Sequence, residues 1–324
     1  MKKIINNCEN IVSEMSEGLV NSSENLELIH GYNTIIRKDI SEKVGLISGG
    51  GSGHEPAHGG FVGYGMLDAA CNGEIFTSPT PDQILSAIKA VDRRKGVLLI
   101  IKNYQGDLMN FEMAAEIATS QGISVSSVIV NDDIGIEEKA NRRGIAGTIF
   151  VHKIAGAAAE KGGDLENIKK IALKVIDNVR SMGVALSSCV VPKIGKPSFS
   201  LNENEIELGI GIHGEKGILR SKIVSADEIS EIILNKILSD LTVKSGDQIA
   251  TIVNGLGGTP LMELLIVNRK VNKYFKNLKV SIYKQYVGNY MTSLEMAGCS
   301  ISVLKIDDEL KQLLDFPVKT VCFS

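Results

Sequence analysis

Two histidines and a glutamate stand within a run of glycines in the segment Gly49–Gly60, which reads GGGSGHEPAHGG. Glycine lets a backbone approach a ligand closely, and the N–H groups at the start of a following helix attract anions and oxygens. A tight turn between a strand and a helix is the alternative interpretation. We favour a pocket for a small polar molecule, because His54, Glu55 and His58 bring functional groups into so open a loop.

This segment does not match the standard nucleotide-binding loops. A P-loop requires Gly-x4-Gly-Lys-Ser/Thr, and no lysine followed by serine or threonine stands in that register. The dinucleotide fingerprint requires glycine or alanine three residues after its second glycine. Here Gly49-x-Gly51 leads to His54, and Gly51-x-Gly53 leads to Pro56. The sequence therefore argues against an unrelated nucleotide-binding α/β protein.

Lys102 and Asp107 follow the apolar run Val97–Ile101. Ligands of open α/β sheets bind beyond the carboxyl ends of the strands, so both residues are expected to face the same crevice as Gly49–Gly60. Asp107 could hydrogen-bond a hydroxyl group or accept its proton. Capping of the next helix explains Asp107 equally well from the local sequence.

A third candidate is His213, which ends the glycine-containing apolar run Glu207–His213. The small neighbours leave its ring approachable, and a neutral imidazole is a nucleophile near pH 7. An isolated histidine is more often structural than catalytic, and His30 and His152, which lack such settings, receive no role.

Other polar strand ends carry weaker signals. The adjacent aspartates of Asn131–Asp133 point in different directions and lack a further ligand at a metal-binding spacing, so a turn or cap is predicted and no metal site. Asn254–Pro260 and Val287–Ser293 could form a second site, and contacts between domains or subunits explain them equally well.

Apolar runs alternate with helical patterns along the chain, which predicts βαβ units around a mainly parallel sheet. The predicted helices are Pro81–Val91, Asn110–Thr119 with Asn110 as N-cap, and Leu165–Met182. The predicted strands and apolar runs are Val44–Ser48, Val97–Lys102, Val125–Val130, Thr148–His152, Val184–Val191, Glu207–His213, Ile249–Val253, Val280–Tyr286 and Ser300–Ile306.

A chain of 324 residues favours two α/β domains, each around a mainly parallel or mixed sheet. Pro192–Asn204 breaks the periodicity, so we predict an N-terminal domain over residues 1–192 that carries the glycine segment. The C-terminal domain would cover residues 193–324, with His213 reaching the shared pocket. A weak echo between Val44–Pro56 and Ile249–Pro260 suggests a shared strand–turn–helix arrangement.

Composition excludes several classes of protein. The net charge of −3 argues against a general nucleic-acid binder. The amino-terminal sequence lacks the unbroken apolar stretch of a signal peptide, and no apolar run reaches the roughly 20 residues of a spanning helix. The five cysteines are scattered without a CxxC pair, which favours reduced thiols over zinc or disulfides. A cytoplasmic protein is expected.

Six motifs in order resemble the dihydroxyacetone-binding subunit of dihydroxyacetone kinases, from about Ile5 to Leu314. They are SGGGSGHEPAHGGFVGYGMLDAA, GEIFTSPTPDQI, IIKNYQGDLMNFEMA, GIGIHGEKGI, VNGLGGTPLMEL and VGNYMTSLEMAG. The resemblance implies that His213 adds through a ring nitrogen to the substrate carbonyl and forms a covalent hemiaminal. It also implies that His54 is the base for the hydroxyl being phosphorylated. The residues it assigns to substrate binding are Gly51, Ser52, Gly53, His54, Lys102, Asp107 and His213.

The resemblance also implies partners. In the bacterial version of this family the substrate subunit carries no nucleotide, a separate subunit holds ADP or ATP with magnesium, and a phosphotransferase protein recharges it. The ATP-dependent version fuses both parts into a longer chain. This chain is therefore expected to be a stand-alone homodimeric subunit that binds dihydroxyacetone and has no cofactor of its own.

One departure from the family keeps an alternative open. Ile134–Asn141 leads directly from Asp133 to Arg142-Arg143-Gly144 and is several residues shorter than usual in the family. Some Gram-positive bacteria encode a paralogue that binds dihydroxyacetone without kinase activity and co-activates a transcription regulator of the operon. We favour the kinase subunit, with this co-activator as the alternative.

Overall fold

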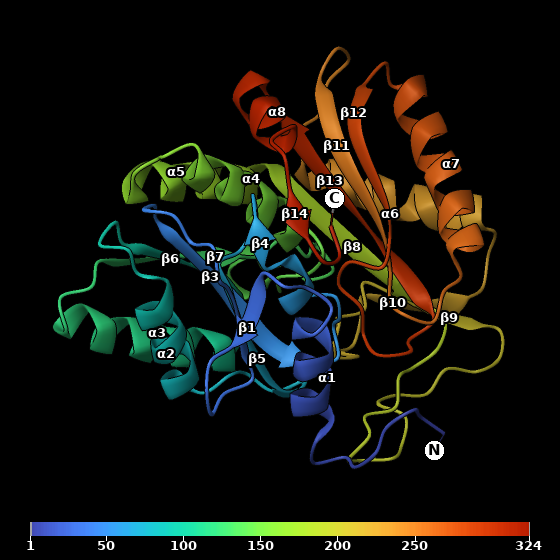
Figure 1. The fold of residues 1–324 in the computed structure, drawn as a ribbon. Helices are drawn as coiled ribbons and strands as arrows, with labels where there is room; N and C mark the ends of the chain where they lie inside the picture. Colours follow the sequence, from blue (N-terminus) through green and yellow to red (C-terminus); the bar gives the residue numbers. More distant parts are fainter. Residues whose placement is uncertain (1, 324) are drawn as a thin grey trace. The chain divides into compact units, whose positions relative to one another are not determined.

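Two six-stranded sheets organise the chain in the computed structural model, which describes residues 2–323 (Figure 1). The chain divides into two compact units. The first comprises the residues up to Val130, Ile149–Val175 and the residues from Leu310 onward. The second comprises Asn131–Thr148 and Ile176–Glu309. Both units contain helices and a sheet, which confirms the predicted α/β class.

The sheet of the first unit has the order β1-β2-β5-β3-β6-β7. Strands β5, β3, β6 and β7 run parallel, and β2 and β1 extend the sheet antiparallel beside β5. The bounds are β1 (Leu26–Leu28), β2 (Thr34–Arg37), β3 (Gly45–Ser52), β5 (Ala69–Ile75), β6 (Val97–Lys102) and β7 (Val125–Val130). A separate antiparallel pair joins β4 (Gly63–Tyr64) to β14 (Lys319–Thr320).

Helices α2 (Pro81–Val91) and α3 (Gln105–Ser120) lie beside each other on this sheet (Figure 1). Ile84 and Ile88 of α2 and Phe111 of α3 are fully buried in one core with apolar residues of β3 and β6. The remaining helical segments are α1 (Ile11–Val20), η1 (Gly59–Phe61), α4 (Thr148–Glu160), α5 (Leu165–Asn178) and α8 (Asp308–Leu314).

The sheet of the second unit has the order β10-β9-β8-β13-β11-β12, and only its β11–β12 pair is parallel. Its strands are β8 (Val179–Ala185), β9 (Glu205–Leu208), β10 (Leu219–Lys222), β11 (Gln248–Gly255), β12 (Ser281–Gly288) and β13 (Gly298–Ile306). Helices α6 (Ala226–Asp240) and α7 (Leu261–Asn277) pack on it through a second core, and η2 (Lys139–Asn141) is a single turn.

The two units do not follow a single boundary near residue 192. Pro192–Asn204 lies between β8 and β9, which pair with each other through Val184 and Leu208. Proline and glycine interrupt periodicity in any loop, including one that joins neighbouring strands of a single sheet. The segment is therefore a loop within the second unit, and the chain returns to the first unit at Leu310.

Several predicted elements are confirmed, and others differ from the structure. Pro81–Val91, Val97–Lys102 and Val125–Val130 form the predicted helix and strands. Thr148–His152 is the start of helix α4, not a strand. Its side chains are buried throughout, so its apolar run has no solvent face from which a helical period could be read. The predicted helix Leu165–Met182 ends at Asn178, and β8 begins at once.

Three further expectations change at element ends. Glu207–His213 is a strand only up to Leu208, because Gly209 leaves the strand with φ of 75°. Helix α3 starts at Gln105, five residues before the predicted N-cap Asn110. The strand–turn–helix arrangement expected for both Val44–Pro56 and Ile249–Pro260 is present only in the second of them. Ile249–Pro260 leads directly into the α-helix α7, whereas Val44–Pro56 leads into the short η1 turn. Within residues 2–323, no helix combines the length and apolar character needed to cross a membrane.

Candidate functional site

The glycine segment begins as part of a strand. Strand β3 continues through Gly49, Gly50 and Gly51 to Ser52 and pairs in parallel with β5, so the predicted strand end at Ser48 is wrong. A Cβ atom on Gly51 would lie 2.6 Å from the backbone N of Thr77. The absence of a side chain at Gly51 therefore lets β3 pack closely against the backbone that follows β5. The expected helix start at this loop is also absent, because only the short η1 turn follows within the described sequence.

Lys102 and Asp107 lie against the backbone of Gly50. A Cβ atom built on Gly50 would stand 3.0 Å from Lys102 Nζ and 3.5 Å from Asp107 Oδ2. Gly50 also has φ of 152°, which disfavours any side chain there. The structure thus brings both polar groups to the glycine segment, as the strand-end argument predicted.

Each of these two side chains is held by its own element. Lys102 ends β6, is 1% exposed, and places Nζ 5.4 Å from the centre of the Tyr104 ring. Asp107 lies in the first turn of α3, where the helix dipole favours a negative charge. The N-cap position belongs to Tyr104, so Asp107 is not the N-cap, and Asn110 within the helix donates to the carbonyl oxygen of Pro79 at 2.8 Å.

His54 is completely buried and stacks on Phe76 with ring centres 5.0 Å apart. The neighbouring Gly53 has φ of 101°, and its N–H donates to both carboxylate oxygens of Glu55 at 3.0 and 3.1 Å. Burial raises the pKa of Glu55. The Ser52 hydroxyl donates to the carbonyl oxygen of Gly73 at 2.6 Å, so this candidate fixes the loop to β5.

Two further buried histidines lie in the same unit. The rings of His58 and His152 meet edge to face with centres 5.2 Å apart. Burial lowers the pKa of both, with a further contribution from the charge of Lys102, and brings that of His152 to about 3. Both rings are therefore neutral at pH 7. No local pattern links His152 with the glycine segment, because helix α4 brings it beside His58 from far along the chain.

His213 belongs to the second unit, whereas the other candidate residues belong to the first. It lies in a loop after β9, and its side chain is 21% exposed. Its Nδ1 is 2.8 Å from Glu215 Oε1, and its backbone N–H donates to Glu215 Oε2 at 2.9 Å. Sequence reasoning missed Glu215. The signal was a carboxylate two residues beyond a candidate nucleophile, the usual partner that orients an imidazole.

The aspartates after β7 both accept hydrogen bonds from backbone N–H groups, which agrees with the predicted turn or cap. Asp132 accepts hydrogen bonds from the N–H groups of Ile145 and Gly147 at 2.8 and 2.9 Å. Asp133 accepts one from the N–H of Gly135 at 2.8 Å. No group of three or more His, Cys, Asp or Glu side chains able to hold a metal occurs in the part of the chain that the structure describes.

Asn254–Pro260 and Val287–Ser293, the two other glycine-containing strand ends, are joined by hydrogen bonds. Asn254 donates to the carbonyl oxygen of Met291 at 2.8 Å and accepts from the N–H groups of Tyr290 and Met291 at 2.9 Å. This pattern supports the packing interpretation of both segments over a second site.

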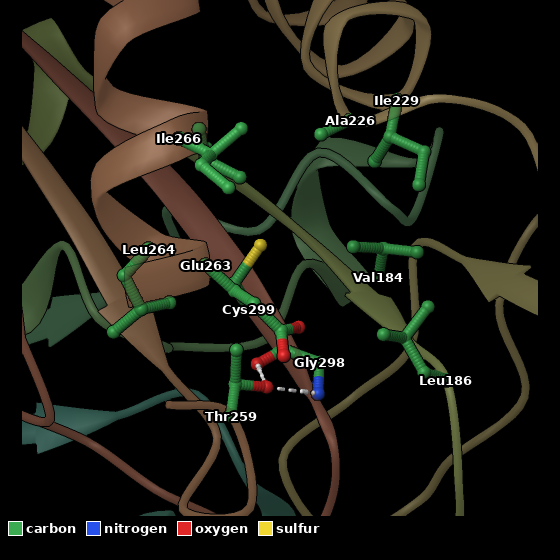
Figure 2. Close-up of a pocket in the computed structure, with 11 residues that line it drawn as sticks. Val184, Leu186, Ala226, Ile229, Thr259, Glu263, Leu264, Ile266, Gly298 and Cys299 are labelled. Carbon is green, nitrogen blue, oxygen red and sulfur yellow. Dashed lines mark hydrogen bonds between the residues drawn. The ribbon is translucent and has the colours of Figure 1, made fainter. Parts of the chain in front are cut away.

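An apolar hollow of about 110 Å³ lies between α6, α7, β8 and β13 (Figure 2). Ile229, Ile266 and Val184 surround it, and Cys299 directs its sulfur toward it. Burial raises the pKa of the Cys299 thiol to about 12. The Thr259 hydroxyl donates a hydrogen bond to the carbonyl oxygen of Gly298 and accepts one from its N–H. These walls do not suit the small polar ligand that the glycine segment indicated.

Comparison with known proteins identifies the family of this chain. The Dak1 domain family matches residues 17–322. The chain is 50% identical to the PTS-dependent dihydroxyacetone kinase 1, dihydroxyacetone-binding subunit DhaK, of Listeria innocua serovar 6a, over 100% of both chains.

Two solved structures are also similar. The dihydroxyacetone kinase operon co-activator Dha-DhaQ has a TM-score of 0.92 at 37% identity and covers 95% of this chain and 97% of its own. The dihydroxyacetone kinase of C. freundii in complex with AMP-PNP and Mg2+ has a TM-score of 0.93 at 36% identity. The match covers 99% of this chain and 60% of the longer kinase chain. The chain belongs to the Dak1 domain family.

Proposed function

We propose that this chain is the dihydroxyacetone-binding subunit of a phosphotransferase-dependent dihydroxyacetone kinase. The observation that carries the proposal is the full-length match to a subunit of that name, at 50% identity over 100% of both chains. The His213–Glu215 pair and the Lys102–Asp107 pair against Gly50 supply the polar groups that the proposal requires.

In this proposal His213 captures the ketone. A ring nitrogen of neutral His213 adds to the carbonyl carbon, and the carbonyl oxygen becomes a hydroxyl. Covalent capture explains how a three-carbon ligand is bound firmly, and it excludes glycerol, which has no carbonyl group. His213 is a partly exposed loop residue, so a small ketone can reach its ring.

The glycine segment acts on the hydroxyl groups of the same ketone. Gly51, Ser52, Gly53, His54, Lys102 and Asp107 are its proposed binding residues. His54 takes the proton of the hydroxyl whose oxygen attacks the phosphoryl group, a task for a positioned imidazole. Lys102 provides a cation near the developing negative charge, and Asp107 accepts a hydrogen bond from a substrate hydroxyl.

The phosphoryl donor belongs to a partner in this proposal. Neither nucleotide fingerprint occurs in the glycine segment, so ADP or ATP with magnesium would be carried by a separate subunit. A homodimer acting in the cytoplasm fits the proposal, and the five free cysteines suit a reducing compartment.

The decisive experiment mixes the purified chain with the nucleotide-bearing subunit, a phosphotransferase donor and dihydroxyacetone, and measures dihydroxyacetone phosphate. We expect product formation that depends on this chain. A matched reaction with glycerol in place of the ketone should give no phosphorylated product. Binding of dihydroxyacetone without turnover would contradict the kinase proposal.

A co-activator of a transcription regulator is the second candidate. Its support is the TM-score of 0.92 to an operon co-activator over 95% of this chain, together with the short segment Ile134–Asn141. This candidate predicts ketone binding without turnover and a ketone-dependent complex with the regulator. Size-exclusion chromatography of the chain with the regulator, with and without dihydroxyacetone, separates the two functions.

A further inference from the structure

The loop that carries His213 is closed by hydrogen bonds of its own backbone. Gly211 N–H donates to the carbonyl oxygen of Glu215 at 3.0 Å, and Gly214 N–H donates to that of Gly211 at 3.1 Å. Within this turn Glu215 uses one carboxylate oxygen for His213 Nδ1 and the other for the His213 backbone N–H. Two contacts to a single carboxylate fix both the position and the rotation of the imidazole.

Arg143 reaches the same turn from a distant part of the second unit. It is only 5% exposed, and its guanidinium donates through Nε to Asp133 Oδ2 and through Nη2 to the carbonyl oxygen of Gly209, both at 2.8 Å. Asp133 is fully buried and is held in turn by the N–H of Gly135. A planar guanidinium with two fixed donors cannot rotate freely, so its third nitrogen has a defined direction.

The third nitrogen, Arg143 Nη1, and the Glu215 carboxylate both lie close to the Cα of Gly211, on the side where a side chain would stand. A Cβ atom on Gly211 would lie 2.5 Å from Arg143 Nη1 and would also collide with Glu215 Oε2. Only glycine leaves room for both groups at this position. The carboxylate therefore contacts the imidazole of His213 and also lies near the positive charge of Arg143.

The charges around Glu215 keep it ionised. Burial raises its pKa, but the hydrogen bond from His213 and the positive charge of Arg143 outweigh that effect and lower the pKa of Glu215 below its ordinary value. An ionised carboxylate can only accept hydrogen bonds, so Nδ1 of His213 must be the protonated nitrogen. The lone pair of the neutral ring is then on Nε2.

We infer that Glu215 is the positioning residue that makes Nε2 of His213 the nucleophile, and that Arg143, held by Asp133, positions Glu215. The inference deepens the proposed function and rests on it. As Nε2 bonds to the carbonyl carbon, the π electron pair moves to oxygen, which takes a proton from water. The ring becomes an imidazolium, whose Nδ1 proton passes to Glu215 and then to solvent, so the adduct is neutral.

The same geometry gives the short segment Ile134–Asn141 a connection to the nucleophile. Asp133 precedes this segment, and Arg143 follows it after one intervening residue. Both residues belong to the support of Glu215. Changes within the segment can therefore alter the orientation of His213 without any contact with substrate.

The first test measures the ring tautomer of His213 by ¹⁵N NMR of the full-length protein between pH 5 and 8. We expect the Nδ1–H tautomer in the unmodified chain. In Glu215→Gln we expect a mixture of tautomers and, on the usual scale for outer-shell partners of a histidine, a roughly 10–100-fold slower formation of the dihydroxyacetone adduct. Glu203→Gln, the same change at an exposed position, should match the unmodified chain.

Arg143→Lys is the second variant. It keeps the positive charge but loses the fixed fork to Asp133 and Gly209, so we expect an intermediate loss of adduct formation rate with the fold retained. An Nε2–H tautomer in the unmodified chain would overturn the inference even if the variants failed to fold. So would a folded Glu215→Gln with an unchanged tautomer and adduct rate. An unmodified chain that forms no adduct but keeps the Nδ1–H tautomer would refute the proposed function while supporting the positioning role.

Discussion

At the scale of single residues, function depends on where each polar group is held. His54 and Lys102 are almost completely buried, whereas His213 is partly exposed in a loop. Burial restricts the first two to one orientation. His213 instead needs Glu215 to fix its ring, because a loop side chain has no surrounding core to do so.

Replacement of His213 tests the covalent step. His213→Ala removes the nucleophile, so we expect complete loss of the mass increase that dihydroxyacetone produces in intact-protein mass spectrometry without borohydride. His30→Ala alters an exposed histidine and should keep the adduct. An undiminished adduct in His213→Ala would refute the covalent role.

Replacement of His54 separates catalysis from binding. If His54 is the base, His54→Ala should lower kcat about 100-fold or more, the usual contribution of a general base, while ligand binding is partly retained. The measurements are coupled turnover with the nucleotide-bearing subunit and calorimetric binding of dihydroxyacetone. Turnover equal to that of His30→Ala would show that another group takes the proton.

At the scale of elements, ion pairs hold the end of α6 to its neighbours within the second unit. Asp240, the last residue of α6, accepts hydrogen bonds from Nη1 and Nη2 of Arg142 at 2.9 and 2.6 Å and from Nε of Arg180 at the start of β8. Arg142 directly precedes Arg143, so this cluster also secures the chain beside the support of Glu215. A single carboxylate thus joins a helix, a strand and a functional loop.

Acid should weaken this cluster in a defined direction. The hydrogen bonds from Arg142 and Arg180 hold the pKa of Asp240 well below its ordinary value of 3.8. A lowered folded-state pKa means that the stability from Asp240 is present above about pH 4 and is lost as the pH falls further. Asp240→Asn should cost about 2 kcal/mol at pH 7.

Urea unfolding at pH 7 and pH 3 measures this effect. The variant and the unmodified chain should differ less at pH 3 than at pH 7. Asp164→Asn is the control, since its carboxylate lies at the exposed start of another helix. An equal difference at both pH values would contradict the role of Asp240 charge.

At the scale of the whole molecule, the chain passes between the two units four times, after Val130, Thr148, Val175 and Glu309. Neither unit is therefore one continuous piece of sequence. Strand β8 pairs with β13, which follows more than a hundred residues later, and β4 pairs with β14 near the carboxyl end. Both pairings depend on segments that a cut at residue 192 would separate.

A fragment of residues 1–192 should therefore not fold cooperatively. It would expose β8 without its neighbours β9 and β13 and would leave β4 without β14. Far-ultraviolet circular dichroism and urea titration of the fragment, beside the full-length chain, provide the measurement. A fragment with a sharp unfolding transition and dispersed amide NMR signals would contradict this expectation.

The sequence alone determined the elements with a clear local pattern. Helix α2 has buried positions three to four residues apart and a Thr80–Pro81 start, and β6 and β7 are short apolar runs, so their bounds could be read directly. The residue types of the candidate site, His54, Lys102, Asp107 and His213, were likewise recognisable. Their chemistry is intrinsic to the side chain and does not depend on the fold.

Only the tertiary structure decided the rest. The apolar run Thr148–His152 predicts a strand but forms the start of helix α4, because a fully buried helix loses the polar face that reveals its period. Glu215 and Arg143 could not be linked from sequence, since a long-range contact leaves no local pattern. The units themselves were set by strand pairing between distant segments, whereas proline and glycine mark only where a chain turns.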